Sequence, residues 1–196
     1  PRFDFEKFPT TSGILGVQMQ SVGEVMSIGR TFRESLQKAF RSLEVGFSGY
    51  DLIKTEARDL DITKIRYATA FRLLKIKQAF QLGYSLKEIY DMTHIDYWFL
   101  SNIQEIIDIE GLISCQNSII DNLKFYKSEG FSDKQIADKS NLTEDEIRKT
   151  RKNNNILPTY KVVDTCASEF KAITPYCYST YEDENEVIPL KGKKII

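Results

Sequence analysis

The residues with the clearest potential for chemistry lie in the segment "SVGEVMSIGR", which combines two glycines with a glutamate and an arginine. A phosphate-binding loop requires closely spaced glycines, followed by a lysine and a serine or threonine that open a helix. Here Gly23 and Gly29 are far apart, and no Lys-Ser/Thr pair follows them. The segment is therefore neither a phosphate loop nor a dinucleotide-binding glycine fingerprint.

The apolar residues of the same segment favour a different interpretation. They predict a buried strand that glycines allow to pack closely, formed by Val22, Val25, Met26 and Ile28. A carboxylate in such a strand needs a partner, so Glu24 is expected either to pair with an arginine such as Arg30 or to have a functional role.

Other reactive side chains are few. His94 is the only histidine, and it lies at an expected helix start. The three cysteines Cys115, Cys166 and Cys177 lack metal-type spacing, and "DTCAS" around Cys166 matches no nucleophile or redox motif. The residues thus predict no catalytic, cofactor-binding or metal site in this chain, and the unpaired cysteines favour a reduced, cytoplasmic environment.

Composition narrows the function classes further. The net charge is -1, which argues against a dedicated nucleic-acid binder because such proteins usually carry a basic excess. No apolar run is long enough to span a bilayer, so no membrane partner is expected. The strand-like opening "PRFDFEKFP" and the closing "KGKKII", which resembles a linker and the start of a strand, indicate a piece of a larger protein.

The elements that carry these residues are predominantly helical. Four serine or threonine capping boxes and a capping aspartate predict the helix starts: Thr31, Ser85, Asp96, Ser132 and Thr143. Gly46, Gly83 and Gly130 are expected stops. "ITKIRYATAFRLLKIKQAFQLG" predicts two helices with a bend, and "YWFLSNIQEIIDIEGLI" the longest helix, with Trp98 in the core.

Strand patterns return from Leu157, in "TYKVVD" and "PYCYSTYE". The predicted fold class is therefore mainly α, with helices over 31–156 and short β segments on both sides.

A DNA-binding module is the alternative function. In residues 131–153, two short capped helices with a tight turn bury Ile136 and Ile147 at the positions of a helix-turn-helix core, while a basic group could contact phosphates: Arg148, Lys149, Arg151 and Lys152. Against it, the second helix opens Glu-Asp-Glu, which would repel phosphates, and basic residues at a helix C-terminus also complement the helix dipole.

Four stretches together resemble one family, in the same order and with similar separations. They are "SVGEVMSIGRTFRESLQKAFRSLE", "HIDYWFL", "TYKVVDTCASEF" and "TPYCYSTYE". They are similar to the carbamoyl-phosphate synthase large subunit, and the resemblance covers essentially the whole chain. The passage from about Ser48 to Lys77 departs most from the family pattern and is shorter.

The resemblance implies an enzyme with two homologous ATP-grasp halves, separated by a helical oligomerisation domain. The first half makes carbamate from bicarbonate, ammonia and ATP, and the second phosphorylates it to carbamoyl phosphate. This chain would then comprise the tail of the first ATP-grasp domain (1–30), the oligomerisation domain (31–156) and the connector to the second half (157–196).

The resemblance also implies cofactors and partners. ATP, Mg or Mn, and K would serve the full ATP-dependent ligase, with none bound in this fragment, which should be inactive alone. Expected partners are a second copy of the chain, the remaining domains of the large subunit and a glutaminase small subunit.

Two residues are assigned roles on the same basis. Glu24 would lie on the route that carbamate takes between the two ATP sites. Ile62 would lie at the oligomer interface, since it precedes the core face formed by Ile65 and Ala68.

Overall fold

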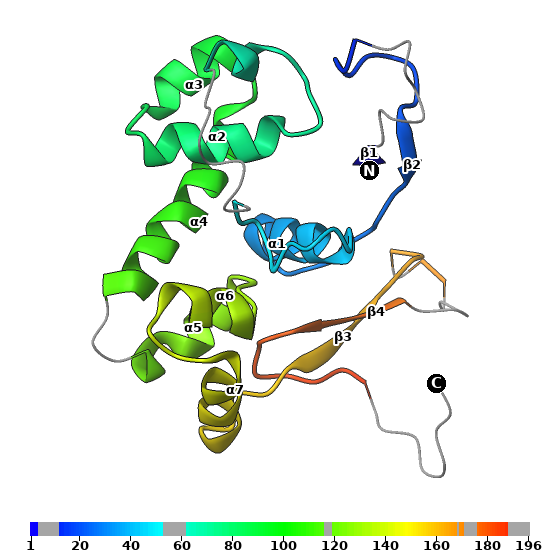
Figure 1. Ribbon diagram of the computed structural model, residues 1–196. Helices are drawn as coiled ribbons and strands as arrows, with labels where there is room; N and C mark the ends of the chain where they lie inside the picture. Colours follow the sequence, from blue (N-terminus) through cyan, green and yellow to red (C-terminus); the bar gives the residue numbers. More distant parts are fainter. Residues whose placement is uncertain (4–11, 53–61, 116–118, 168, 171–175, 188–196) are drawn as a thin grey trace.

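The computed structural model describes residues 1–3, 12–52, 62–115, 119–167, 169–170 and 176–187, and these form a mainly helical protein. Figure 1 shows α2 and α3 at one end, α5, α6 and α7 at the other, and the long helix α4 running between them. Helix α1 lies in the middle, with the β1–β2 pair and the β3–β4 hairpin on either side of it. The predicted fold class is confirmed.

Helix α1 spans Phe32–Ser42 and begins at the expected cap. The Thr31 hydroxyl accepts a hydrogen bond from the Glu34 amide at 3.1 Å. The Glu34 carboxylate, however, accepts from the amide of Arg30 at 2.7 Å rather than from that of Thr31. Gly29 permits this arrangement, because a Cβ there would lie 2.8 Å from Glu34 Oε2.

The predicted pair of bent helices is a 3₁₀ helix, η2 (Ile62–Arg66), followed by α2 (Arg72–Gln81). Gly83 ends α2 with a φ of +89°, as a left-handed C-terminal position favours. Ser85 forms a full capping box with Glu88 and opens α3 (Leu86–Thr93).

Helix α4 spans Tyr97–Cys115 and is the longest of the described helices, as predicted. The prediction that Trp98 lies in the core is wrong, because its side chain is 55% exposed. The buried stripe of α4 begins at Leu100 and continues through Ile103 and Ile106, and Trp98 lies off that stripe in the first turn. There it contacts Phe32 of α1 edge-on, at 5.3 Å between ring centroids.

The last helices are short. The helix that Gly130 was expected to end is divided into η3 (Ile120–Asn122) and α5 (Leu123–Ser128). Helices α6 (Asp133–Lys139) and α7 (Glu144–Asn153) both begin with complete capping boxes, as predicted.

The strands form two antiparallel pairs, β1 (Arg2–Phe3) with β2 (Ser21–Gly23), and β3 (Thr159–Val163) with β4 (Tyr176–Thr180). The predicted buried strand from Val22 to Ile28 is wrong: β2 ends at Gly23 and Met26 is 73% exposed. Its apolar residues do not alternate, and the pairing with β1 ends at Gly23.

The core is one cluster shared by the helices, and it includes Ile65, Ile76, Ile103, Leu123 and Ile136. Helix α4 contacts α1, α2, α3 and α6, so it connects the two ends of the helical region. Within the described residues, no helix combines the length and apolar character needed to cross a bilayer.

Candidate functional site

The first two turns of α1 hold together two segments that are distant in the sequence. One is the stretch before α1, residues 27–31, and the other is the β3–β4 hairpin near the end of the chain. We call these contacts the clasp, and its central side chains are Glu34 and Lys38.

Glu34 is the buried acceptor of the clasp, with 1% of its surface exposed. Its Oε2 accepts from the Arg30 amide at 2.7 Å and from the Thr180 hydroxyl of β4 at 3.1 Å. Its Oε1 pairs with Lys38 Nζ at 2.8 Å. A buried carboxylate is costly unless it is paired and hydrogen-bonded, and here each contact comes from a different part of the chain.

Lys38 is the donor of the clasp. Its Nζ donates to the carbonyl of Ile28 at 2.9 Å and to the carbonyl of Ser179 in β4. The ammonium group also lies 5.6 Å from the ring centroid of Tyr178. One lysine therefore connects the segment before α1 directly to the hairpin.

Exposed contacts extend the clasp at its edge. Arg30 Nε donates to Glu182 Oε1 at 2.7 Å, and the other oxygen of Glu182 lies 3.4 Å from Lys161 Nζ. Arg30 thus pairs with the segment after β4, and the predicted pairing with Glu24 is not found.

A second charged cluster supports the clasp from the side of α5, α6 and α7. Asp133 accepts from Lys127 at 2.7 Å and from Arg151 at 3.0 Å, and both cations lie over the ring of Tyr181. Burial lowers the pKa of Lys127 to about 8, despite the attraction of Asp133. Burial raises the pKa of Asp133, but Lys127 and Arg151 outweigh it and leave the pKa below its usual value.

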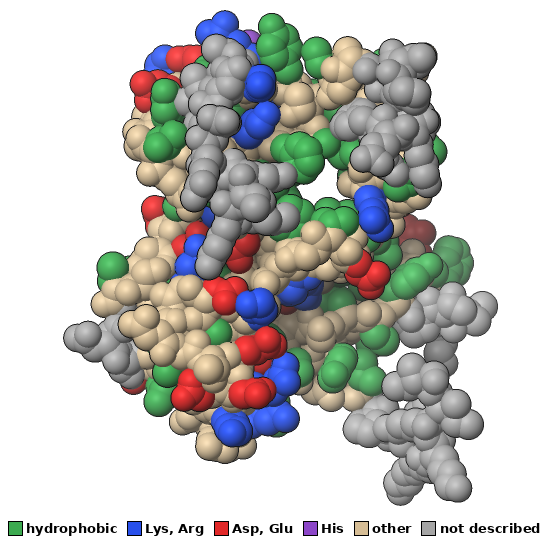
Figure 2. Space-filling model, viewed as in Figure 1, with side chains coloured by type: hydrophobic (Ala, Val, Ile, Leu, Met, Phe, Trp, Pro, Cys, Tyr) green, Lys and Arg blue, Asp and Glu red, His purple; other side chains and the backbone are tan. Residues whose placement is uncertain are grey.

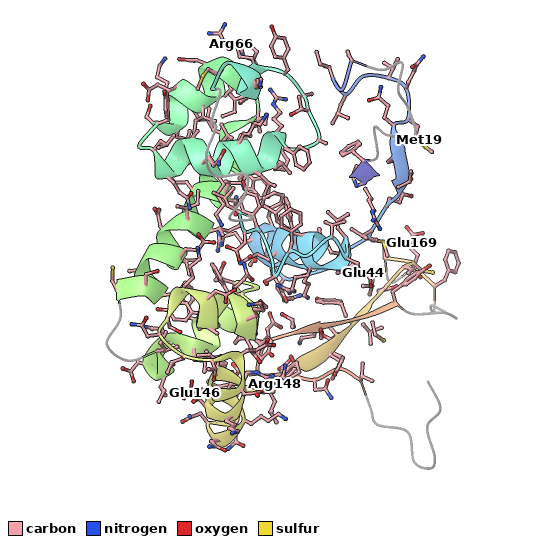
Figure 3. All side chains as sticks on the ribbon, viewed as in Figure 1. Met19, Glu44, Arg66, Glu146, Arg148 and Glu169 are labelled. Carbon is pink, nitrogen blue, oxygen red and sulfur yellow. The ribbon has the colours of Figure 1, made fainter. Side chains whose placement is uncertain are left out.

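A polar cavity of about 330 Å³ lies between these two clusters. It is lined by α1, the turn between α5 and α6, α7 and the hairpin. Acidic and basic side chains intermingle over this part of the surface (Figure 2). Figure 3 shows Arg148 on α7, and this residue lines the cavity but already pairs with Glu144 at 3.1 Å.

A larger cavity of about 660 Å³ lies between the β1–β2 pair and helices α1 and α2. Its lining is mostly apolar and includes Phe71, Leu73 and Leu36.

A third charged cluster fixes the two ends of the helical region to one another. Lys77 of α2 donates to Glu110 of α4 and to the carbonyl of Tyr50, and its surface is fully buried. Lys139 of α6 lies 3.5 Å from Glu110, and Asp51 lies 3.5 Å from Lys77. Burial raises the pKa of Glu110, and the two ammonium groups limit that rise.

The residues singled out from the sequence are not gathered into one site. Glu24 is exposed in the irregular stretch after β2. Ile62 begins η2, but its side chain lies outside the described residues. His94 adopts a left-handed conformation at the end of α3, where it is a helix cap.

The three cysteines are the remaining reactive residues named from the sequence. Cys115, Cys166 and Cys177 are free thiols. In the part of the chain that the structure describes, no group of three His, Cys, Asp or Glu side chains could hold a metal ion.

The basic residues of the DNA-binding alternative are partly engaged within the protein. Arg151 is bound to Asp133, and Arg148 pairs with Glu144. Lys149 and Lys152 are exposed. Two packed capped helices are present as predicted, but they belong to the common core through Ile136 and Ile147.

Lys38, Lys77 and the acidic residues with which they pair were not predicted from the sequence as functional residues. A local signal exists for Lys77, because it falls on the apolar face of α2 beside Ile76 and Phe80. The pairing of Lys38 with Glu34 has a local signal, since the two residues are four apart on one helix, but none points to its hairpin partner Ser179, which is 141 residues away.

Comparison with known proteins gives one consistent result. The family model described as carbamoyl-phosphate synthetase large chain, oligomerisation domain, matches residues 24–155. The carbamoyl phosphate synthase large chain of Archaeoglobus fulgidus is 45% identical over 209 residues, covering 100% of this chain and 19% of that relative. The corresponding protein of a Nostoc species is 45% identical over 202 residues, covering 100% of this chain and 18% of that relative.

The fold and the clasp define a helical domain that joins two flanking β segments. The chain belongs to the family of the carbamoyl-phosphate synthetase large chain oligomerisation domain, as its resemblance indicated. It spans about a fifth of the length of the curated relatives it matches. The family match includes all of residues 131–153, and the comparisons give no support to the DNA-binding alternative.

Proposed function

We propose that this chain is an internal segment of a carbamoyl phosphate synthase large chain that serves assembly and links the two ATP-grasp halves. The observation that carries the proposal is the similarity of the whole chain to about a fifth of two such large chains. The clasp supports it, because it fastens the two segments that flank the helical region to the same helix.

The division of the chain follows from this role. Residues 1–30 are the tail of the first ATP-grasp domain, 31–156 the oligomerisation domain, and 157–196 the connector to the second half. The start of α1 at Phe32 and of β3 at Thr159 supports the proposed boundaries, although the family match begins earlier, at residue 24.

The parent enzyme makes carbamoyl phosphate from bicarbonate, ammonia or glutamine, and ATP. It acts in the cytoplasm with Mg or Mn, K and a glutaminase small subunit, and with a second copy of the large chain. This chain contributes association and linkage rather than catalytic groups, so the isolated chain has no ATPase or ligase activity.

Self-association is expected to use the end of the molecule that carries η2. Arg66, the last residue of η2, is exposed at that end (Figure 3). The substitution Ile62→Glu places a charge in an apolar contact and should weaken association by on the order of a few kcal/mol. Sedimentation velocity of the parent polypeptide measures this as a shift toward the smaller species.

A matched control is Ile120→Glu at the opposite end of the helical region. Ile120 is also an isoleucine in a 3₁₀ helix, and it is 50% exposed. This variant should sediment like the parent. Unchanged sedimentation of Ile62→Glu, at concentrations where the parent associates, excludes Ile62 from the interface.

Glu24 is proposed to lie on the route of carbamate between the two ATP sites. There it would pair with an arginine and control the availability of that arginine to the passing anion, and its exposed side chain is free to reach such a partner in the neighbouring domain. Glu24→Gln in the parent enzyme should preserve bicarbonate-dependent ATP hydrolysis and lower the formation of carbamoyl phosphate.

The control for charge removal is Glu44→Gln, at an exposed position after α1 (Figure 3). It should leave both activities unchanged. A parallel fall of the two activities in Glu24→Gln, or no fall in either, makes Glu24 a structural residue.

A further inference from the structure

We propose that Lys38 and Glu34 are positioning residues that set the relative placement of the two catalytic halves of the parent enzyme. Through the clasp they keep carbamate transfer coupled to ATP hydrolysis. The inference rests on the proposed function, since it takes the segments before α1 and after α7 as the ends of the two halves.

The geometry of Lys38 is the first support. A single ammonium group binds the Ile28 carbonyl, the Ser179 carbonyl and the Glu34 carboxylate, so it uses its three donors on three different segments. Ile28 precedes α1 and Ser179 lies in β4, and the lysine itself lies in the second turn of α1. The placement of β4 relative to residue 28 therefore depends directly on this side chain.

The geometry of Glu34 is the second support. Its Oε2 accepts from Arg30 in the first flanking segment and from Thr180 in the second. Through Lys38 and Glu34, helix α1 thus binds each flanking segment once with a cation and once with an anion. Such charge-assisted hydrogen bonds are shorter and stronger than neutral ones, and their partners are held in fixed positions.

The close contacts around Glu34 also leave little room for the flanking segments to move relative to α1. A Cβ on Gly29 would lie 2.8 Å from its Oε2, and a Cβ on Gly130 would lie 2.7 Å from its Cα. The start of α1 is therefore enclosed between the first flanking segment and the turn that precedes α6. A shift of either flanking segment relative to α1 requires a clasp contact to break.

Misplacement of the two halves would affect carbamate, the unstable intermediate that passes between them. Carbamate that escapes into water reacts with one water molecule to give bicarbonate and ammonia, so the ATP already hydrolysed in the first half yields no product. Misplacement of the two halves increases this escape without removing any group that contacts ATP. The expected signature is a loss of coupling with both half reactions retained.

The test uses the parent polypeptide and three measurements on each variant. They are bicarbonate-dependent ATP hydrolysis, ATP formation from ADP and carbamoyl phosphate, and carbamoyl phosphate formed per ATP hydrolysed in the first half. In Lys38→Met both half reactions should stay within about two-fold of the parent. The product formed per ATP should fall about ten-fold or more, because the loss of one charge-assisted hydrogen bond corresponds to about that factor and Lys38 makes three such contacts.

Three further variants test whether the loss of coupling comes from the contacts of Lys38 and Glu34. Lys38→Arg keeps the charge and several donors, and should restore coupling. Thr180→Val removes the hydroxyl bound to Glu34 with little change in shape, and should lower coupling in the same direction. Lys134→Met removes an exposed lysine that pairs with Asp138, four residues along the same helix, and should leave coupling unchanged.

Unchanged coupling in both Lys38→Met and Thr180→Val overturns the inference. So does a parallel loss of both half reactions and of product, because this is the signature of general damage. Absence of both half reactions from the unmodified parent polypeptide contradicts the proposed function itself, and the inference with it.

Discussion

Lys77→Met is expected to lower the free energy of unfolding by about 3–5 kcal/mol, the usual cost of breaking a buried ion pair by removing one partner. Lys77 has no exposed surface, and Glu110, its partner in α4, is almost completely buried. Loss of the ammonium group leaves the Glu110 carboxylate desolvated, with Lys139 at 3.5 Å as its remaining cation. Urea denaturation followed by circular dichroism measures the change.

A double-substitution cycle identifies the origin of this loss. Glu110→Leu alone should also destabilise the protein, because it leaves Lys77 buried with Asp51 at 3.5 Å. The double variant Lys77→Met/Glu110→Leu should be more stable than the sum of the two single effects predicts, since no charge of the pair is then left unpaired. Strict additivity would show that the pair is not coupled.

The control for lysine removal is Lys87→Met. Lys87 pairs with Asp91 at 2.7 Å across one turn of α3, but both side chains are largely exposed. Exposed pairs of this kind contribute little to stability. Equal effects of Lys77→Met and Lys87→Met would contradict the assigned role of the buried cluster.

Gly130→Ala is expected to destabilise the protein by about 3 kcal/mol or more, the sum of left-handed backbone strain and overpacking. Gly130 has a φ of +89°, and an added Cβ would lie 2.7 Å from Glu34 Cα and 3.2 Å from Gln37 Cβ. Helix α1 crosses the turn before α6 at this point, and Arg41 donates to the Gly130 carbonyl at 2.7 Å. The methyl group therefore forces the two elements apart.

Gly83 provides a closely matched control. It has the same φ of +89°, and it also ends a helix with a hydrogen bond from the following amide to a carbonyl five residues earlier. Nothing lies within 4 Å of a Cβ added there. Gly83→Ala should therefore cost only the backbone strain, about 1–2 kcal/mol. Equal losses in the two variants would show that the contact with α1 is not tight.

The helical part of the fold was predictable because its signals are local. Ser85, Ser132 and Thr143 each accept from the amide three residues later, as the capping boxes require. The glycine stop at Gly83 was likewise identified from the sequence. Such signals need only neighbouring residues, so the pattern reveals them without knowledge of the tertiary structure.

The prediction of a strand around Val25 was wrong because a strand, unlike a helix cap, depends on residues that are not its neighbours in the sequence. Strand formation depends on a partner strand, and β1 pairs only with the first residues of that segment. Trp98 was misplaced because hydrophobicity alone does not show where the buried stripe of a helix begins. In both cases the local composition resembled that of buried structure, but the neighbouring element did not cover it.

The contacts of the clasp with the hairpin could not be predicted from the sequence, whereas Glu34 and Lys38 form a local pair four residues apart on one helix. The contact between Glu34 and Thr180 joins residues separated by 146 positions, and neither residue has an unusual local context. The buried pair of Lys77 and Glu110 has a partial signal in the sequence, since both residues fall on apolar helix faces. A charged residue on such a face indicates a partner from another element, but not which one.

The most direct test of the assembly role is sedimentation equilibrium of the purified chain over a range of concentrations. If the domain serves assembly, the average mass rises with concentration above the 22.7 kDa of one chain. A single species of 22.7 kDa at every concentration would contradict the proposal that this domain assembles the enzyme.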